Sequence, residues 1–176
     1  MSVWSPFLRE QLALTLANRK VLLGITGSIA AFKACDIIRY LRACGAQVKV
    51  VLSESAEKFV TPSTLETLSG EPVLSSLWKH GTGTHHIATA RWAEVVLIAP
   101  ASANTIAKLA HGFADNLLTT ETLAFTGPLL IAPAMNPAMF DHSATQDNLE
   151  TLRRRGCTVL GPGSGDTACG EEGTGR

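Results

Sequence analysis

The stretch KVLLGITGSIAAFKACDIIRYLRACGAQVKVVL, residues 20–52, contains a complete unit of strand, turn, helix and strand. It opens with KVLLGI, an aliphatic run that is typical of a buried strand. After the turn TGS, apolar residues recur at helical spacing from Ala30 to Leu41, and Gly45 marks the end of the helix. The closing run QVKVVL predicts a second strand. A crossover between parallel strands takes roughly thirty residues, so this stretch predicts the first unit of an α/β fold.

The rest of the chain continues this alternation of aliphatic runs and helical patterns. We expect further strands at residues 94–99, 128–132 and 157–160, and helices at residues 61–70, 102–110, 115–124 and 143–155. Most of the strands are apolar throughout, which is typical of parallel strands covered on both faces. Neither a repeat nor an interior linker interrupts the pattern. The sequence therefore predicts one doubly wound α/β domain with a parallel sheet, over residues 19–160.

Three segments do not fit the pattern of this domain. Residues 1–18 form a lead-in segment whose leucines suggest a short amphipathic helix, which either covers the domain or meets a partner chain. Residues 81–84, GTGT, predict a mobile loop. Residues 161–176, GPGSGDTACGEEGTGR, are too rich in glycine to build a core element. The tail nevertheless carries a cysteine, Cys169.

Composition and charge exclude several classes of function. Fifteen basic and fifteen acidic residues give a formal net charge of zero, unlike the basic excess typical of proteins that bind nucleic acids. The four cysteines contain no C-x-x-C pair, so we expect no metal site and reduced thiols. The first twenty residues lack the regions of a signal peptide, and the apolar runs are too short to span a bilayer. We therefore expect a cytoplasmic protein that does not bind membranes.

A ligand site is expected beyond the carboxyl ends of the strands, where open parallel sheets bind their ligands. The loops predicted at that edge are TGSIA (26–30), SES (53–55), PASANT (100–105), PAMNPAM (133–139) and the tail from residue 161. They are rich in Ser, Thr, Asn, Gly and Pro, which supply hydroxyls, amides and backbone N–H groups without fixed charge. A ligand with one phosphate group fits such a set.

Each loop also has a purely structural interpretation. The first loop lacks the G-x-G-x-x-G fingerprint of dinucleotide sites, and Ser28 either helps to bind one phosphate at a helix N-terminus or only caps that helix. Capping the next helix needs only Ser102, whereas Asn104 and Thr105 add polar groups beyond that need. Asn136 is either a turn residue or an amide that holds a carboxylate or carbonyl.

The histidines give no hydrolase signature. Loop and helix-end histidines are usually solvated, and no spacing of Ser, His and Asp stands out among them. His86 differs because it opens the run HIATARW, which leads into the third strand.

Five motifs occur together in a familiar order: GSIAA, HIATARWAEVVLIAPASANTIAKLA, GFADNLL, PAMNPAM and ACGEEGTGR. Over residues 19–176 they resemble the flavin-dependent cysteine decarboxylases, and ACG in the tail resembles the branch that serves coenzyme A biosynthesis. The resemblance implies a Rossmann-like domain that binds FMN at a subunit interface, in homo-oligomers that are trimers or dodecamers of four trimers. Bacterial relatives continue into a phosphopantothenate–cysteine ligase domain, which the resemblance implies only for a longer chain.

The resemblance also implies roles for individual residues. His86 matches the active-site histidine and Cys169 the second catalytic residue. Asn136, flanked by Met135, matches the asparagine that binds the substrate carboxylate, and Ala168 is expected beside the substrate as well. The residues expected to bind FMN are Gly27, Ser28, Ile29, Ser53, Ser55, Ser102, Ala103, Asn104, Thr105 and Ala134. Phe140 stands where relatives usually have tryptophan, so we expect a changed contact there rather than lost activity.

The implied reaction is FMN-dependent decarboxylation of 4′-phospho-N-pantothenoylcysteine to 4′-phosphopantetheine, through a thioaldehyde and an enethiolate. His86 would act as a base or electrostatic partner, and Cys169 would supply a proton. Residues 161–176 would close over the substrate as a lid. Two alternatives remain: a peptidyl-cysteine decarboxylase that forms C-terminal enethiols, and a non-catalytic FMN-binding regulatory subunit.

Overall fold

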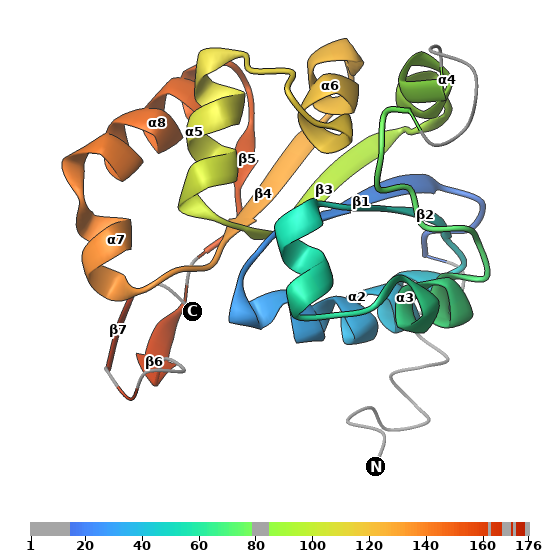
Figure 1. Cartoon of the computed structure of the whole chain (residues 1–176), viewed down its shortest axis with the longest axis horizontal. Helices are drawn as coiled ribbons and strands as arrows, with labels where there is room; N and C mark the ends of the chain where they lie inside the picture. The colour runs from blue at the N-terminus through green and yellow to red at the C-terminus, as the bar shows by residue number, and fades with distance from the viewer. Residues whose placement is uncertain (1–14, 79–84, 162, 167–169, 171, 175–176) are drawn as a thin grey trace.

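A five-stranded parallel sheet forms the centre of the protein (Figure 1). The computed structural model describes residues 15–78, 85–161, 163–166, 170 and 172–174. The strands lie in the order β2-β1-β3-β4-β5. Their bounds are β1 Lys20–Ile25, β2 Gln47–Leu52, β3 Val95–Ala101, β4 Leu129–Pro133 and β5 Thr158–Val159. The strands predicted from the sequence are confirmed, to the residue for β1 and β2 and with shifted or shorter bounds for the other three.

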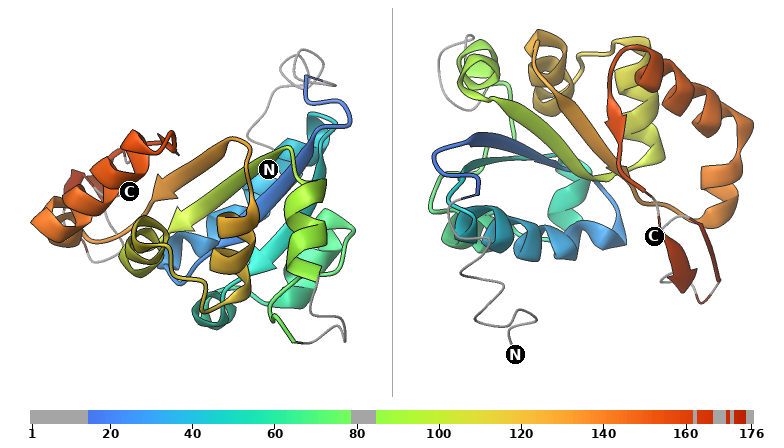
Figure 2. Two further views of the ribbon diagram at one scale, coloured as in Figure 1. Left: turned by 90° about the horizontal axis from the view of Figure 1, so that it is seen from above. Right: turned by 180° about the vertical axis from the view of Figure 1, so that it is seen from behind.

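Helices connect the strands and cover both faces of the sheet (Figure 2). They are η1 Ile29–Lys33, α2 Ala34–Ala43, η2 Glu54–Lys58, α3 Pro62–Ser69, α4 His85–Trp92, α5 Ala103–His111, α6 Leu117–Ala124, α7 Pro137–Asp141 and α8 Ser143–Arg154. The helix pattern that starts after TGS is thus divided into a 3₁₀ turn and an α-helix. Among the described residues, no helix is both long and apolar enough to cross a membrane.

The core lies in two layers, one on each face of the sheet. Leu23 and Ile25 of β1 belong to the layer beneath α2 and α3, together with Ile38 and Leu65. Leu22 of β1 belongs to the opposite layer, which packs against α5, α6 and α8. Because successive strand residues point to opposite faces, an apolar run such as KVLLGI fills both layers.

Helix ends follow local sequence signals. The Thr61 hydroxyl accepts a hydrogen bond from the Thr64 N–H at the start of α3, and the helix ends at Gly70 with φ +74°. Ser102 caps α5 in the same way, and that helix ends at Gly112 with φ +72°. Glycine adopts this left-handed conformation without the steric cost of a Cβ atom.

Some elements depart from the sequence-based expectation. The segment HHIATARW forms the helix α4, although its apolar residues show little helical periodicity. Its packing against α6 supplies the stabilisation that the local pattern does not indicate. In the tail, β6 (Ser164–Asp166) and β7 (Glu172–Thr174) pair as short antiparallel strands. The lead-in segment in which a short helix is predicted, residues 1–18, lies outside the described residues except for residues 15–18, which form a turn. The predicted loop at residues 81–84 lies outside the described residues as well.

Candidate functional site at the carboxyl edge of the sheet

The strand order places the loops that follow β1 and β3 next to each other. The chain runs from β1 to β2 on one side and resumes at β3 on the other side of β1, so the winding direction reverses between β1 and β3. At such a reversal the two following loops diverge and leave a crevice at the carboxyl edge, which is where doubly wound sheets bind ligands. TGSIA and PASANT leave the sheet at this point.

Thr26 joins these two loops. Its hydroxyl donates a hydrogen bond to the Pro100 carbonyl at 2.7 Å and accepts one from the Ser102 N–H at 2.9 Å. The side chain is fully buried, so both bonds are shielded from water. The Ala99–Pro100 peptide is cis. The sequence predicted that the loop TGSIA lies at this edge but did not indicate this role of Thr26. The one signal for it is that Thr26 directly follows a buried strand.

The loop after β2 packs against the first loop. The Ser53 N–H donates to the Ile25 carbonyl at 3.0 Å, and the Ser53 and Ser55 hydroxyls lie 3.3 Å apart. A Cβ atom added to Gly27 would lie 2.5 Å from the Ser55 Oγ, which is closer than atoms can approach. Glycine at this position therefore lets the two loops meet and brings Gly27, Ser53 and Ser55 together.

The loop after β4 joins the same edge. The Ala134 N–H donates to the Ala101 carbonyl at 3.1 Å, which links PAMNPAM to PASANT. Met135 packs against the core, whereas Asn136 caps α7, because its Oδ1 accepts a hydrogen bond from the Ala138 N–H at 2.9 Å. Phe140 packs against the same core layer. The predicted substrate asparagine is thus held by the turn that it caps.

Ser28 and Ser102 both cap helices. The Ser28 hydroxyl accepts from the Ala30 N–H at 3.3 Å. The Ser102 hydroxyl accepts from the Thr105 N–H at 3.3 Å and donates to the Thr105 hydroxyl at 3.2 Å. These contacts confirm the capping interpretation of both serines. They also leave two helix N-termini at this edge, where the first backbone N–H groups have no partner within the helix. Ile29, Ala103 and Asn104 lie in these first turns.

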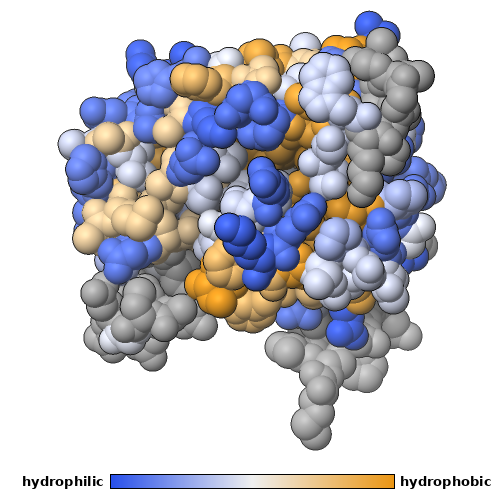
Figure 3. All heavy atoms as spheres, in the orientation of Figure 1, coloured by the Kyte–Doolittle hydropathy of each residue, from blue (hydrophilic) through white to orange (hydrophobic). Residues whose placement is uncertain are grey.

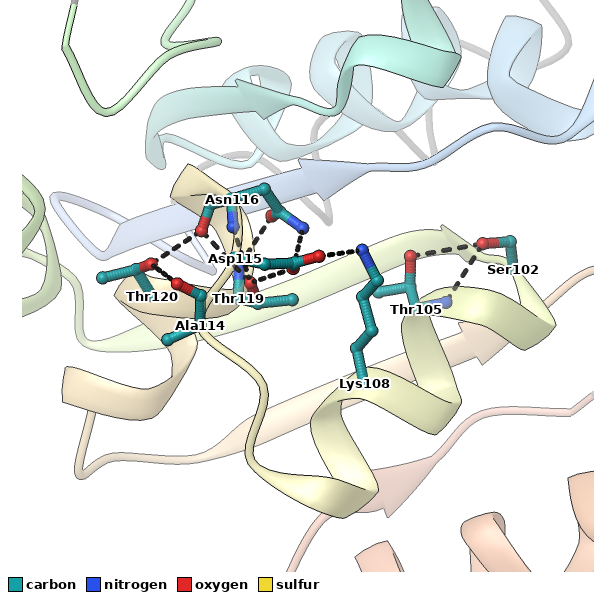
Figure 4. A network of polar contacts seen from close by, with 8 residues as sticks. All are labelled: Ser102, Thr105, Lys108, Ala114, Asp115, Asn116, Thr119 and Thr120. Carbon is teal, nitrogen blue, oxygen red and sulfur yellow. Dashed lines mark hydrogen bonds and ion pairs between the residues drawn. The ribbon is translucent and has the colours of Figure 1, made fainter.

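A polar network continues along α5 from this edge (Figure 4). Lys108, one turn beyond Thr105, forms an ion pair with Asp115 in the loop before α6. The Asp115 carboxylate also accepts a hydrogen bond from the Asn116 amide at 3.0 Å. The Lys108 ammonium lowers the pKa of the Asp115 carboxyl, with a smaller contribution from Asn116. The network ties α5 to the start of α6 and thereby orients the helix that begins at the site.

His86 does not lie with these loops in the same chain. It is half-buried on α4, which lies beside α6 near the end of the sheet where β3 begins (Figures 1 and 2). The loops gather at the other end, where the strands finish. The predicted catalytic Cys169 and its neighbour Ala168 lie outside the described residues.

The site residues at this edge offer hydroxyl, amide and backbone N–H groups for hydrogen bonding around two helix N-termini. This arrangement suits an anionic group such as a phosphate, since N–H groups and the positive end of the helix dipole face it. Within the described ranges, no three His, Cys, Asp or Glu side chains gather as metal ligands would. A separate cavity of about 310 Å³ opens between the ends of α5 and α6 and the starts of β4 and β5. None of the predicted site residues lines it.

Comparison with known proteins gives a consistent result. The family described as Flavoprotein matches residues 10–176. The coenzyme A biosynthesis bifunctional proteins CoaBC of Vibrio vulnificus and Escherichia coli are 46% and 44% identical over 92% and 93% of this chain. The chain spans about 41% of the length of each relative.

Solved structures share the fold across nearly the whole chain. The FMN-dependent cysteine decarboxylase SpaF has a TM-score of 0.82 at 33% identity, covering 92% of both chains. A cysteine-to-serine mutant of a PPC decarboxylase, complexed with pantothenoylaminoethenethiol, has a TM-score of 0.79 at 35% identity, covering 90% of both chains. The peptidyl-cysteine decarboxylase EpiD has a TM-score of 0.78 at 29% identity, covering 89% of this chain and 90% of its own.

Proposed function

Because the chain belongs to the Flavoprotein family, we propose that it binds FMN and decarboxylates 4′-phospho-N-pantothenoylcysteine to 4′-phosphopantetheine in coenzyme A biosynthesis. The observation that carries this proposal is the joining of four loops, rich in hydroxyl, amide and backbone N–H groups, into one edge at the reversal between β1 and β3. The similarity to the CoaBC proteins and to PPC decarboxylase supports the choice of substrate. We place the FMN-binding domain in residues 19–160, the substrate lid in residues 161–176, and the protein in the cytoplasm.

The residues at this edge fit FMN. Ile29 is the first residue of η1, Ser28 is its N-cap and Gly27 precedes the cap, and all three would present backbone N–H groups to the phosphate. The remaining hydrogen-bond groups would hold the polar parts of the cofactor; they come from Ser53, Ser55, Ser102, Ala103, Asn104, Thr105 and Ala134. The contact between Gly27 and Ser55 supports this fit, because it leaves no side chain between the first two loops.

We propose that a second copy of the chain completes the site. His86 on α4 lies away from the loops of its own chain, so a neighbouring copy would have to supply it. Two large apolar side chains beside the first loop, Ile29 and Phe32, are 55% and 57% exposed. Figure 3 shows hydrophobic side chains at the surface over the start of η1, beside the charged surface of η2. Burial of this surface against another copy would stabilise a homo-oligomer, a trimer or four trimers.

The side chains of the chain would position and protonate the substrate. When bound, FMN would supply two-electron oxidation at the cysteinyl Cβ, so that the oxidised carbon–sulfur group can accept the electron pair left by CO₂. The Asn136 amide would hold the carboxylate, with Met135 and Ala168 beside it, and His86 would act as base or electrostatic partner. Cys169, in the glycine-rich tail at residues 161–176, would protonate the enethiolate as that segment covers the substrate.

A peptidyl-cysteine decarboxylase is the second candidate. The similarity to the peptidyl-cysteine decarboxylase EpiD supports it, since that structure matches the fold about as closely as PPC decarboxylase does. Such an enzyme would act on a C-terminal cysteine of a peptide and stop at the enethiol. Cys169 and its ACG setting favour the first candidate, because reduction beyond the enethiol needs a proton donor as well as the two electrons that the reduced flavin would return.

The test uses purified protein, FMN and the two substrates. We expect flavin absorbance after reconstitution, and formation of 4′-phosphopantetheine detected by mass spectrometry. His86→Asn should retain FMN and lose about 100-fold or more in turnover, whereas Cys169→Ser should release the enethiol. His111→Asn changes an exposed histidine at the end of α5 and serves as the control. Enethiol formation from a cysteinyl peptide alone would favour the second candidate, and failure to take up FMN would refute both.

A further inference from the structure

Glu121 carries a buried carboxyl group that has no direct part in the proposed decarboxylation. Its side chain is fully buried in α6. Neither carboxyl oxygen has a hydrogen-bond partner among the described residues. A buried carboxylate without partners is costly, and such a group usually stays neutral instead. Burial accordingly raises the pKa of the Glu121 carboxyl to about 8.

The surroundings of Glu121 connect it to α4. This helix packs mainly on α6, and its buried Thr89 lies near the Glu121 carboxyl. Trp92, at the end of α4, stacks beneath the Lys49 ammonium of β2, 4.6 Å from the ring centroid. The Thr89 hydroxyl and the Lys49 ammonium lower the pKa of the carboxyl, but by less than burial raises it.

We propose that Glu121 is a positioning residue that holds α4 on α6 in its protonated form, and that its ionisation releases the helix carrying His86. A neutral acid fits the dry contact between the two helices, whereas a carboxylate there must gain water or a counter-charge. Either change opens the contact with Thr89. Since His86 lies in the first turn of the same eight-residue helix, it moves with it. The part concerning His86 rests on the proposed function.

The charged groups on the elements around Glu121 are not placed to neutralise its carboxylate if it loses its proton. Lys49 is the charged residue of β2 and already contacts Trp92. On α4, Arg91 is exposed and His86 lies at the other end of the helix. On α5, Lys108 is paired with Asp115, and His111 is exposed at the helix end. Glu121 is itself the single charged residue of α6.

The direct test measures the protonation of the Glu121 carboxyl and the position of α4 with two separate methods. Carbon-13 NMR of glutamate-labelled protein should show one carboxyl that titrates near pH 8 and is absent from Glu121→Gln. In a background where the other two tryptophans are phenylalanine, Trp92 fluorescence should change with the same midpoint. Glu121→Gln stays neutral and should hold the low-pH signal throughout. Glu150→Gln removes a carboxylate on α8 and should titrate like the wild type.

A third readout concerns the reaction. The turnover of the FMN-loaded protein should fall about tenfold from pH 7 to pH 9 through this group, since its protonated fraction falls by that factor around a pKa of about 8. Glu121→Gln should keep the wild-type turnover at neutral pH and should not show this tenfold decrease in turnover between pH 7 and pH 9. Lys49→Met should move the midpoint to higher pH, because the ammonium lowers the pKa of the carboxyl.

Two results would overturn the inference. One is a Glu121 carboxyl that titrates near 4.5 like an exposed glutamate. The other is a Trp92 signal in Glu121→Gln that changes with pH as in the wild type. If the wild-type protein does not decarboxylate either substrate, the proposed function fails alone, since the NMR and fluorescence measurements still decide the role of Glu121.

Discussion

The Thr26 hydroxyl holds two loops together with one oxygen atom. It donates to Pro100 and accepts from Ser102 at the point where the sheet reverses its winding. A hydroxyl can do both at once, whereas no other small side chain of that shape can. The relative position of the two loops proposed to bind FMN therefore depends on Thr26, which need not contact the ligand itself.

Thr26→Val should show this dependence. Valine has the same shape but leaves the Pro100 carbonyl and the Ser102 N–H buried without this partner, which costs about 1–3 kcal/mol in free energy of unfolding. We also expect weaker FMN binding, measured by flavin fluorescence titration. Thr67→Val is the matched control, because Thr67 is exposed and its hydroxyl donates to the Ser63 carbonyl within α3. Equal losses of stability in the two variants would contradict the assignment.

The packing of α6 on β1 depends on the absence of a side chain at one position. Gly24 lies in β1, and Leu118 of α6 sits directly on it. A Cβ atom at Gly24 would lie 2.6 Å from Leu118 Cδ1. Because Leu118 is 2% exposed, it has little room to move away. The close contact between Gly24 and Leu118 thus fixes the position of α6 on β1. Helix α4 in turn packs on α6.

Gly24→Ala should destabilise the protein by overpacking, by about 1–3 kcal/mol in chemical denaturation. Shortening the opposing side chain should restore part of that loss, so Gly24→Ala combined with Leu118→Val should be more stable than the sum of the two single changes predicts. Simple additivity would show that α6 does not press on β1 at this point. The cycle uses stability alone and so does not depend on any assigned function.

The complete site proposed above depends on the proposed assembly of several copies of the chain. The loops of one chain and α4 of the same chain lie at different ends of the sheet. The proposed catalytic centre is therefore only half present in a single copy. The exposed Phe32, one helical turn from Ile29, lies where a second copy would meet the loops.

Phe32→Asp should reduce both the oligomeric mass in light scattering and the flavin content after gel filtration. A charge in the interface would be desolvated without a partner, which opposes association. Phe113→Asp is the control, because Phe113 is equally exposed at 57% but follows α5, away from the loops. If both variants assemble and retain FMN as the wild type does, the proposed interface is wrong.

The sequence by itself determined the order of the elements. KVLLGI and QVKVVL, short aliphatic runs on either side of a helical pattern, predicted buried strands. Helices capped by Thr61 and Ser102 begin where these hydroxyls accept backbone N–H groups. These signals are local, because periodicity and capping depend on neighbours within a few residues. The same local signals brought the residues of the four loops to one edge, since parallel strands all end there.

Only the tertiary structure decided which residues lie side by side. The joining of loops by Thr26, the helix over HHIATARW and the burial of Glu121 all depend on contacts between segments far apart in the chain. Glu121 lies in the segment TTETLA, where the sequence alone predicts that an acidic side chain is exposed to solvent. It is buried because α4, whose own sequence barely indicates a helix, packs over it. Local patterns specify elements, but the environment of a side chain depends on what the fold places against it.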